Sequence, residues 1–561
     1  MTEYMLNNKF NDPFNKVKLG VSLGERNQLE EFSKVLRSGA NMVEVDIASV
    51  YGLMEERGGS AANIGKEERQ IIGNLAKVND VDLSIHAPWA INFSGIDPNS
   101  GQRNPEYGTL VNNEIKAAVK FADDVSQSMG RKNMPIIFHA SSDQFGDPDK
   151  SLRLTAYDNY EDKVLLVSEE RLDHVDSENF KKMYGEENFK KLSQLGMKED
   201  PERKSIVLPP AANFEFKKIL AKGSYTQERS NLEFSKRNVE LQLNEIPILL
   251  ARAAAKNDLA EIENLKKKKA DFDQMLKDLE ARKMKLELDS KNIDSRYKVF
   301  DELAPQFAAE GIKTAAMESF NSATKPMILV ENPMSPNMSL SNPKATAKTV
   351  QIAREEFANE LVQKRHMSKA EAKQMSEELI GINLDVGHVN VFKSYSKGIN
   401  PSTGEPIPYT DEDIVNMAKD AKNYIKRYHL NDNMGDVDAH LPLGQGNAPV
   451  KKIYDELLKS GVDVPAIMEV FGGLGGMESG SIQSLQYMGA PAYGNVPYAS
   501  MSSYLSQPYS AIIGDYSSYS NLGLRQDFFP YSGFSGIMPI SGGGYMNNNN
   551  SNNSFSGASM Y

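Results

Sequence analysis

The 561-residue chain contains no cysteine, one tryptophan and seven histidines. Without cysteine it can form no disulfide, thiolate zinc site or iron–sulfur cluster, and it has no cysteine nucleophile. It also lacks an apolar run of about 18 residues, so no transmembrane helix is expected. The first residues lack the apolar centre of a signal peptide, which favours a cytoplasmic protein. Any metal site must use histidine and carboxylate ligands.

The chain also has fewer basic residues than acidic residues. The chain has 64 Lys and Arg against 76 Asp and Glu, a formal net charge of −12. This balance argues weakly against a nucleic-acid-binding protein with a broadly basic surface, although a local cationic groove or bound metal ions would serve instead. Apolar residues make up 40% of the chain, enough for a sizeable core. The length exceeds that of one ordinary domain.

The C-terminal segment has a composition of its own. Over residues 481–561, Ser, Gly, Asn, Tyr and Met dominate, and only Asp515, Arg525 and Asp527 carry charge. No helical or strand period is visible there, so we expect a disordered tail. The favoured interpretation is a solubilising tail, and the alternative is a segment for self-association or partner binding.

A heptad pattern marks the middle of the chain. The apolar residues that recur every seven positions are Leu265, Phe272, Leu279, Leu286, Ile293 and Phe300. This spacing predicts a coiled-coil arm. A second helical pattern covers 229–255, so we expect an antiparallel hairpin that turns near 256–258. A self-contained arm is the favoured interpretation, and self-association or partner binding is the alternative.

The rest of the chain alternates between strand and helix patterns. Short apolar strands are predicted at 18–23, 42–47, 81–87, 135–140, 327–332, 381–386, 424–430 and 465–470. Eight strands with crossover helices indicate an α/β fold, the (β/α)8 TIM barrel, in which only the connection between strands 4 and 5 is too long for one helix. The predicted domains are the first half of the barrel at 15–145, a helical insertion with the arm at 146–304, the second half at 305–480 and the disordered tail at 481–561.

Polar side chains gather at the ends of six consecutive predicted strands. Those of metal-ligand type are His86, His139, Glu331, Asp385, His388, His429, Asp438, His440 and Glu469. The carboxyl ends of barrel strands meet at one mouth, where catalytic groups of such folds lie. One histidine alone is explained by a hydrogen bond that caps its strand, but nine such groups are not. Histidine and carboxylates without thiolates suit Zn²⁺, Mn²⁺ or iron.

The number of groups bears on the chemistry. One ion takes three or four protein ligands, so nine groups exceed the need of one ion and suit three that share carboxylates. Such a cluster is suited to phosphodiester hydrolysis. A sugar isomerase or epimerase needs only one ion, and Glu331, Asp385, His429 and Glu469 would hold it. That alternative leaves the other five groups without a role.

Six motifs carry a family resemblance. They are SIHAPWAIN (84–92), IIFHAS (136–141), ILVEN (328–332), INLDVGH (382–388), YHLNDNMGDVDAHLPLGQGNA (428–448) and IMEV (467–470). Together they resemble endonuclease IV, or AP endonuclease family 2, within the xylose isomerase-like TIM-barrel superfamily. The resemblance covers the barrel and excludes the arm and the tail. It implies cleavage of the phosphodiester 5′ of abasic sites in duplex DNA by a zinc-bound hydroxide.

The resemblance also assigns residues. It implies three Zn²⁺ ions, with Mn²⁺ as an alternative at one site. No membrane partner is expected, because the chain lacks a long apolar run. The implied ligands of the first ion are His86, His139 and Glu331. The second ion shares Glu331 and is also bound by Asp385, His429 and Glu469. The implied ligands of the third ion are His388, Asp438 and His440. Glu331 and Glu469 would also orient the nucleophile as catalytic residues.

The predicted DNA contacts come from two loops. The resemblance places Trp89, Ala90 and Asn92 on a loop that enters DNA at the lesion, where an apolar wedge can open a duplex. Arg26 is the candidate on the loop after the first strand. An alternative role for Trp89 is to cover the metal site.

Overall fold

The computed structural model describes residues 19–23, 42–47, 60–88, 91–148, 153–400 and 405–470, together with positions 32, 403, 480, 484, 487 and 488. Three predicted DNA contacts, Arg26, Trp89 and Ala90, lie outside the described residues, as does nearly all of the predicted tail. The chain divides into two compact units. One comprises Met1–Asp149 and Asp301–Tyr561, and the other is Lys150–Phe300.

The first unit is built on a closed parallel barrel. Its strands are β1 (Leu19–Ser22), β2 (Met42–Asp46), β3 (Asp82–His86), β4 (Pro135–His139), β11 (Met327–Glu331), β12 (Ile380–Asp385), β15 (Ile425–Leu430) and β16 (Ala466–Met468). They close in the order β1-β16-β15-β12-β11-β4-β3-β2. Each predicted strand is present at its predicted place, and the (β/α)8 TIM-barrel fold class is confirmed.

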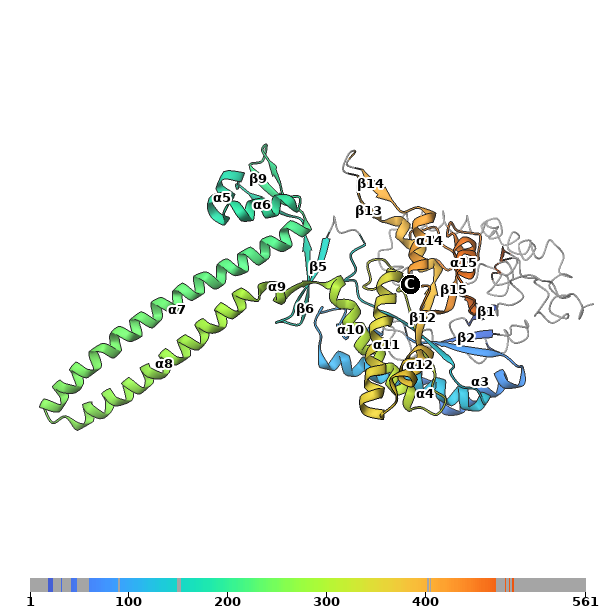
Figure 1. The fold of residues 1–561 in the computed structure, drawn as a ribbon, viewed down its shortest axis with the longest axis horizontal. Coiled ribbons are helices and arrows are strands. Elements are labelled where there is room, and N and C mark those ends of the chain that lie inside the picture. Colours follow the sequence, from blue (N-terminus) through green and yellow to red (C-terminus); the bar gives the residue numbers. More distant parts are fainter. Residues whose placement is uncertain are drawn as a thin grey trace, which may run out of the picture. The chain divides into compact units, whose positions relative to one another are not determined.

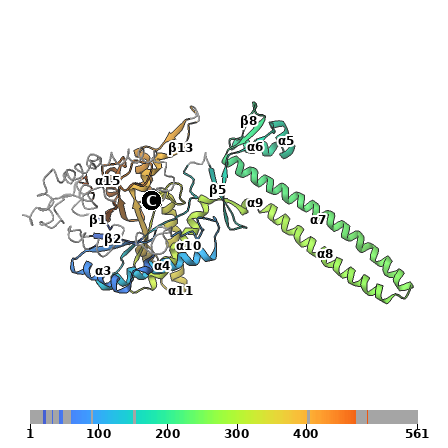
Figure 2. The ribbon, with the colours of Figure 1, turned by 180° about the vertical axis from the view of Figure 1, so that it is seen from behind.

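Helices cover the outside of the strands (Figures 1 and 2). They are α3 (Lys66–Val78), α4 (Pro105–Met129), α10 (Phe300–Asn321), α11 (Pro343–Arg365), α12 (Lys369–Leu379), α14 (Asp411–Asp420) and α15 (Val450–Lys459). In α15 the buried residues Val450, Ile453, Tyr454 and Leu457 follow the spacing of one helix face. No helix in the described part of the chain is long and apolar enough to cross a membrane.

Smaller elements lie in the connections that follow β2 and β12. They are η2 (Ala61–Asn63), α13 (Val386–Asn390), η3 (Val391–Ser394), β13 (Ser396–Ile399) and β14 (Pro406–Pro408). The strand register determines which polar residues at the strand ends lie side by side. Glu331 pairs with His139 between β11 and β4, and Asp385 pairs with His429 between β12 and β15. Parallel pairing therefore brings these four side chains to one height in the barrel.

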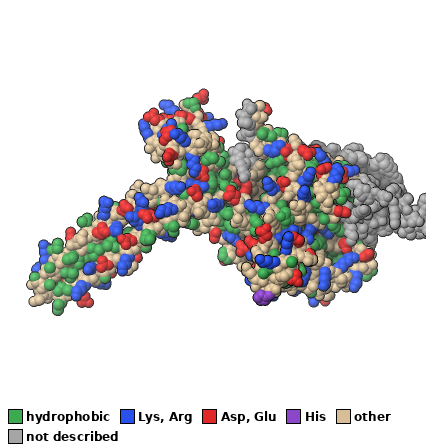
Figure 3. All heavy atoms as spheres, in the orientation of Figure 1, with side chains coloured by type: hydrophobic (Ala, Val, Ile, Leu, Met, Phe, Trp, Pro, Cys, Tyr) green, Lys and Arg blue, Asp and Glu red, His purple; other side chains and the backbone are tan. Residues whose placement is uncertain are grey.

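The second unit contains two long helices that pack against each other, α7 (Pro210–Ala255) and α8 (Leu259–Lys291). They are joined at residues 256–258, where the sequence predicts the turn. Ile246, Ala253 and Leu265 form a buried cluster between them. Along this arm, basic and acidic side chains are interspersed on the face shown in Figure 3, so its surface is solvated rather than strongly of one sign.

The insertion is not wholly helical, which corrects the prediction for 146–304. One antiparallel sheet contains β10 (Tyr297–Val299), β5 (Arg153–Asp158) and β6 (Lys163–Ser168), and a second contains β7 (Glu170–Asp173), β9 (Ser205–Leu208) and β8 (Lys198–Asp200). Short helices complete the unit: α5 (Ser177–Tyr184), α6 (Glu186–Gln194) and α9 (Ile293–Arg296). Phe180, Leu192 and Ile206 are buried in a core of their own. Tertiary packing therefore stabilises strands whose sequences are short and charged.

Candidate metal centre

All nine ligand-type residues predicted from the sequence converge at the mouth of the barrel. They form groups whose ligand atoms lie within 4.8 Å of one another: His86, His139 and Glu331; His86, His429 and Glu469; Glu331, Asp385, His429 and Glu469; and His388, Asp438 and His440. Eight of the nine are buried and Asp438 is partly buried. Such a concentration of buried polar groups is costly unless each is paired or coordinates an ion.

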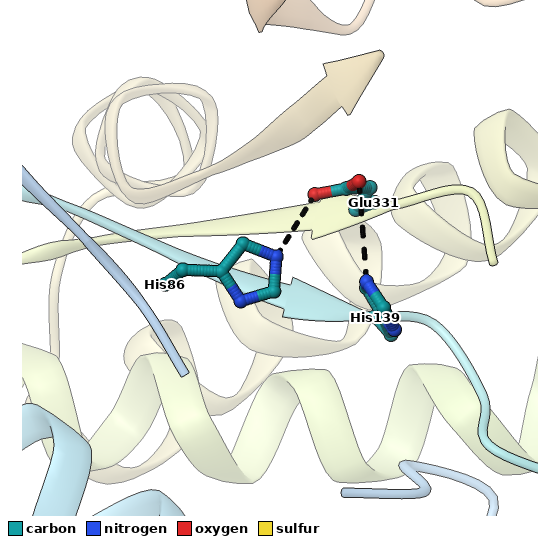
Figure 4. Close-up of side chains that lie close together, drawn as sticks. All are labelled: His86, His139 and Glu331. Atoms are coloured by element: carbon teal, nitrogen blue, oxygen red, sulfur yellow. Dashed lines mark ion pairs between the residues drawn. The ribbon is translucent and has the colours of Figure 1, made fainter. Parts of the chain in front are cut away.

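Glu331 lies at the centre of this arrangement, at the end of β11. Its Oε2 atom is 3.5 Å from Nε2 of His86, and its Oε1 atom is 3.9 Å from Nε2 of His139 (Figure 4). Oε2 also lies 3.2 Å from Nδ1 of His429. One carboxylate therefore faces imidazoles from three strands and belongs to two of the ligand-type groups.

The His429 ring faces a set of carboxylates from three strands. Its Nδ1 atom lies 3.0 Å from Oε2 of Glu469 and 4.0 Å from Oδ2 of Asp385, in addition to its contact with Glu331. Three carboxylates and one imidazole are a complete donor set for one divalent cation.

The third group lies on the loop that follows β15 and on α13. Oδ2 of Asp438 is 3.0 Å from Nε2 of His388 and 2.8 Å from Nε2 of His440. On the other side of each ring, Nδ1 faces a main-chain carbonyl, that of Asn332 for His388 and that of Glu469 for His440.

These ring contacts determine where hydrogen atoms sit. A carbonyl only accepts, so the Nδ1 atoms of His388 and His440 must donate to it. Each neutral ring then presents an Nε2 lone pair to Asp438, which is also an acceptor. Acceptors that face one another require a proton or a cation between them. His86 follows the same pattern, because its Nδ1 lies 2.9 Å from the carbonyl of Ala87 and its Nε2 faces Glu331.

The pKa values report the same excess of negative charge. Burial alone would lower the pKa of His86, but the Glu331 carboxylate outweighs it and raises the pKa to about 10. Burial likewise opposes protonation of His440, yet Asp438 raises its pKa to about 9. His139 is the exception, since burial lowers its pKa to about 3. Burial raises the pKa of Asp385 to about 7. The side chains at the mouth therefore bind protons at positions where a metal cation would compete with those protons for the same ligand atoms.

Several buried atoms of the cluster have no hydrogen-bond partner among the described residues. They are Oε1 of Glu331, Nδ1 and Nε2 of His429, Oδ1 of Asp438 and Oε2 of Glu469. The close approaches of His429 to Glu469 and to Glu44 are therefore ion-pair contacts and not aligned hydrogen bonds. Buried polar atoms are nearly always paired, and a bound ion is a recognised reason for an exception. The donor set, its spacing and these atoms fit divalent metal ions. The histidines and carboxylates around Glu331, together with the Asp438 group, would hold them.

The ligand-type side chains are supported by residues that were not predicted from the sequence. The Asn383 amide donates to Oε2 of Glu331 at 2.9 Å, and the Asn431 amide donates to Oδ2 of Asp385 at 2.7 Å. Glu44 on β2 lies 2.9 Å from His429. A signal was present in the sequence, because Asn383 and Glu44 are polar residues inside strands with apolar neighbours, and Asn431 follows His429 by two residues just after β15.

Asp432 organises the loop that carries the third group. Its buried carboxylate accepts hydrogen bonds from the backbone N–H groups of Asn433, Gly444, Gly446 and Ala448, each at 2.9 Å. This carboxylate thereby ties the Gly-Gln-Gly turn to the end of β15. The HLND motif thus contains both a ligand-type residue and the residue that holds the following loop.

Of the predicted DNA contacts, only Asn92 lies within the described residues. Its side chain is fully buried. The Asn92 amide donates to the carbonyl of Ile96 and to the carboxylate of Asp143, and its Oδ1 accepts from Ser94. These contacts give Asn92 a structural role inside its loop, and its contact with DNA stays a prediction that this buried position does not support.

The chain is similar to known proteins in both sequence and fold. A family model described as xylose isomerase-like TIM barrel matches residues 335–489. A comparison with curated proteins gave no match. Solved structures that resemble the chain include a D-tagatose 3-epimerase-like protein (12% identity, TM-score 0.35), covering 84% of this chain and 96% of that one.

Two further solved structures were found. A protein from Thermus thermophilus, soaked with ZnCl2, has 12% identity and a TM-score of 0.33, with 86% of this chain and 99% of that one covered. A putative xylose isomerase from Rhodospirillum rubrum has 9% identity and a TM-score of 0.38, with 85% and 99% covered. The closed barrel and the family match together support placing the chain in the xylose isomerase-like TIM-barrel superfamily.

Proposed function

We propose that this chain is a metal-dependent phosphodiesterase of the endonuclease IV type, acting on abasic sites in DNA. The observation that carries the proposal is the division of nine ligand-type side chains into adjacent groups at the barrel mouth. A single ion takes three or four protein ligands. Three ions, with Glu331 shared, use all nine residues, and we expect Zn²⁺ with Mn²⁺ as an alternative at one site.

The proposed chemistry divides between the ions and the chain. Bound divalent ions supply Lewis acidity, which activates water and neutralises charge on a phosphodiester. Glu331 and Glu469 flank His429 and are placed to orient an attacking water through their oxygens. Asp438 holds His388 and His440 toward one point, where the three side chains would hold a divalent ion whose charge would offset that of a phosphodiester.

The choice of DNA as substrate rests on the motif resemblance. The net charge of −12 does not favour a polyanion. Three divalent ions would add six positive charges at the mouth, where a phosphodiester has to bind. Local charge of this kind matters more for binding at the site than the sign of the whole chain.

A second candidate is a sugar isomerase or epimerase that uses one divalent ion. Glu331, Asp385, His429 and Glu469 form a complete four-residue group by themselves. The family description names xylose isomerase, so the family match supports this candidate more directly than it supports DNA cleavage. Under this function, His86, His139 and the Asp438 group remain without a role, which is why we place it second.

A cleavage assay separates the two candidates. The metal-loaded chain is incubated with a duplex oligonucleotide that carries one tetrahydrofuran abasic analogue. We expect a nick 5′ of the analogue, reduced at least about 100-fold by Glu469→Gln, the scale on which lost transition-state contacts act. The exposed Glu355→Gln on α11 is the matched control. No nick by a chain with metal bound, together with epimerisation or isomerisation of a sugar followed by NMR, would establish the second candidate instead.

A further inference from the structure

Resting on the metal-binding function proposed above, we propose that Glu44 is a positioning residue that holds the His429 imidazole from behind and turns Nδ1 toward the ion-binding carboxylates. Oε1 of Glu44 lies 2.9 Å from Nε2 of His429, and both side chains are fully buried. Glu44 belongs to β2 and His429 to β15, which are not neighbours in the barrel. The contact therefore crosses the barrel interior beneath the ligands.

The other histidines of the cluster show why such a contact matters. In His86, His388 and His440, a main-chain carbonyl lies behind the ring at Nδ1, and Nε2 points into the cluster. His429 is turned the other way, with Nδ1 toward Glu331 and Glu469 and with Nε2 toward Glu44. Glu44 thus occupies the place that a carbonyl occupies behind the other rings. Oε1 of Glu44 and Nε2 of His429 lie at ion-pair distance and do not form an aligned hydrogen bond. A carboxylate in this place favours the tautomer with its hydrogen on Nε2 and strengthens the ring as a ligand.

Glu44 is itself held in place. The Ser84 hydroxyl donates to its Oε2 at 2.8 Å, and Ser84 is its register partner on β3. Nη1 of Arg427 lies 3.8 Å from the same oxygen. Arg427 precedes His429 by two residues on β15, so both side chains point to the same side of the strand. One oxygen of Glu44 therefore accepts a hydrogen bond from Ser84 and faces the charge of Arg427, and the other oxygen faces His429.

A competing explanation is that Glu44 only neutralises the buried Arg427. The two roles differ in their effect on metal binding. If Glu44 positions His429, its loss weakens ion binding and changes the ring tautomer, whereas neutralisation of Arg427 affects only stability. Asp143 provides a matched control, since it is a fully buried acid whose partners are Asn92, Ser339 and Phe145.

The test compares the full chain with Glu44→Gln, Ser84→Ala and Asp143→Asn. Zn²⁺ affinity is measured by competition with a chromophoric chelator. We expect Glu44→Gln to weaken the affected site about 10–100-fold, the range found for lost outer-shell partners. Ser84→Ala should shift affinity in the same direction by less, and Asp143→Asn should leave it unchanged. In long-range ¹H–¹⁵N spectra of the Zn²⁺-loaded protein, His429 should carry its hydrogen on Nε2.

The outcomes distinguish this role from the function on which it rests. A wild-type chain that binds no Zn²⁺ would overturn the metal-binding function itself. Wild-type binding with equal affinity in Glu44→Gln, or equal losses in Glu44→Gln and Asp143→Asn, would overturn the positioning role alone. If Glu44→Gln does not fold, the proposal is tested by the wild-type spectrum and by the Zn²⁺ affinity of Ser84→Ala. A hydrogen on Nδ1 of His429, or an unchanged affinity in Ser84→Ala, would contradict the proposal.

Discussion

The Glu331 carboxylate faces the His429 imidazole at the mouth of the barrel, with Oε2 3.2 Å from Nδ1. Because Glu331 belongs to two of the ligand groups, its loss should affect two ions together. We expect Glu331→Gln to lose two of three ions and to keep the one held by the Asp438 group. Elemental analysis after dialysis measures this, with Glu355→Gln as the control. Loss of a single ion would show that Glu331 is not shared.

Metal binding should release protons. Glu331 raises the pKa of His86 to about 10, and Asp438 raises that of His440 to about 9, in each case against the effect of burial. In the metal-free protein both rings are therefore protonated at pH 7.5, and a metal ion must displace these protons. Calorimetric titrations in two buffers of different ionisation enthalpy should show proton release, which disappears above about pH 10 as the rings lose their protons beforehand.

The same shifts predict how the metal-free protein responds to pH. A folded pKa above the ordinary value of about 6.5 stabilises the fold below pH 6.5, and this stabilisation is lost as the pH rises through about 9 to 10. Thermal unfolding of the metal-free chain should therefore move to lower temperature between pH 7 and pH 10. In the loaded chain the ions replace these protons, so the fall should be smaller. An equal fall in both forms would contradict the assignment.

Asp432 should matter for the fold rather than for ligation. Asp432→Ala removes the acceptor for four backbone N–H groups of one loop. We expect it to lower the free energy of unfolding by roughly 2–4 kcal/mol, since hydrogen bonds to charged groups contribute about 1.5–3 kcal/mol each and are not additive. Denaturant unfolding measures this loss, and amide exchange should become faster at residues 444–448. The exposed Asp436→Ala is the control.

Gly387 lies between two ligand-type residues and permits a close approach. A Cβ atom at this position would collide with the Asn431 side chain, which donates to Asp385. We therefore expect Gly387→Ala to displace Asn431 and to weaken metal binding without removing any ligand. Zn²⁺ competition compared with Gly108→Ala, where a Cβ meets open space, measures the effect. Unchanged affinity in both variants would show that Asn431 does not support Asp385.

Much of the barrel could be predicted because its signals are local. Each strand is a short apolar run between helical patterns, and ligand-type residues such as His86 and His139 stand at strand ends, where barrel geometry brings them together. The hairpin of the second unit was likewise visible, since the heptad from Leu265 onward continues through α8. These features depend on spacing along the chain.

Other features depend on contacts between distant residues. Glu44 is one of two acids in β2, and its contact with His429 exists only because the barrel closes. The strand Glu170–Asp173 has a charged sequence, Glu-Arg-Leu-Asp, and is stabilised by pairing with Leu208–Ser205. Asn92 suggests a surface contact from its motif, but its loop turns it inward to Asp143. Such long-range packing cannot be inferred from local pattern.

The number of ions bound per chain tests the central claim most directly. Elemental analysis of the purified full chain, after removal of loosely bound metal, should give about three divalent transition-metal ions, as the shared ligand groups imply. His388→Ala should reduce this number by one, whereas His366→Asn, an exposed position with a φ of 55° that Asn adopts readily, should not. A single ion that His388→Ala leaves in place would contradict the three-ion site and favour the one-ion isomerase.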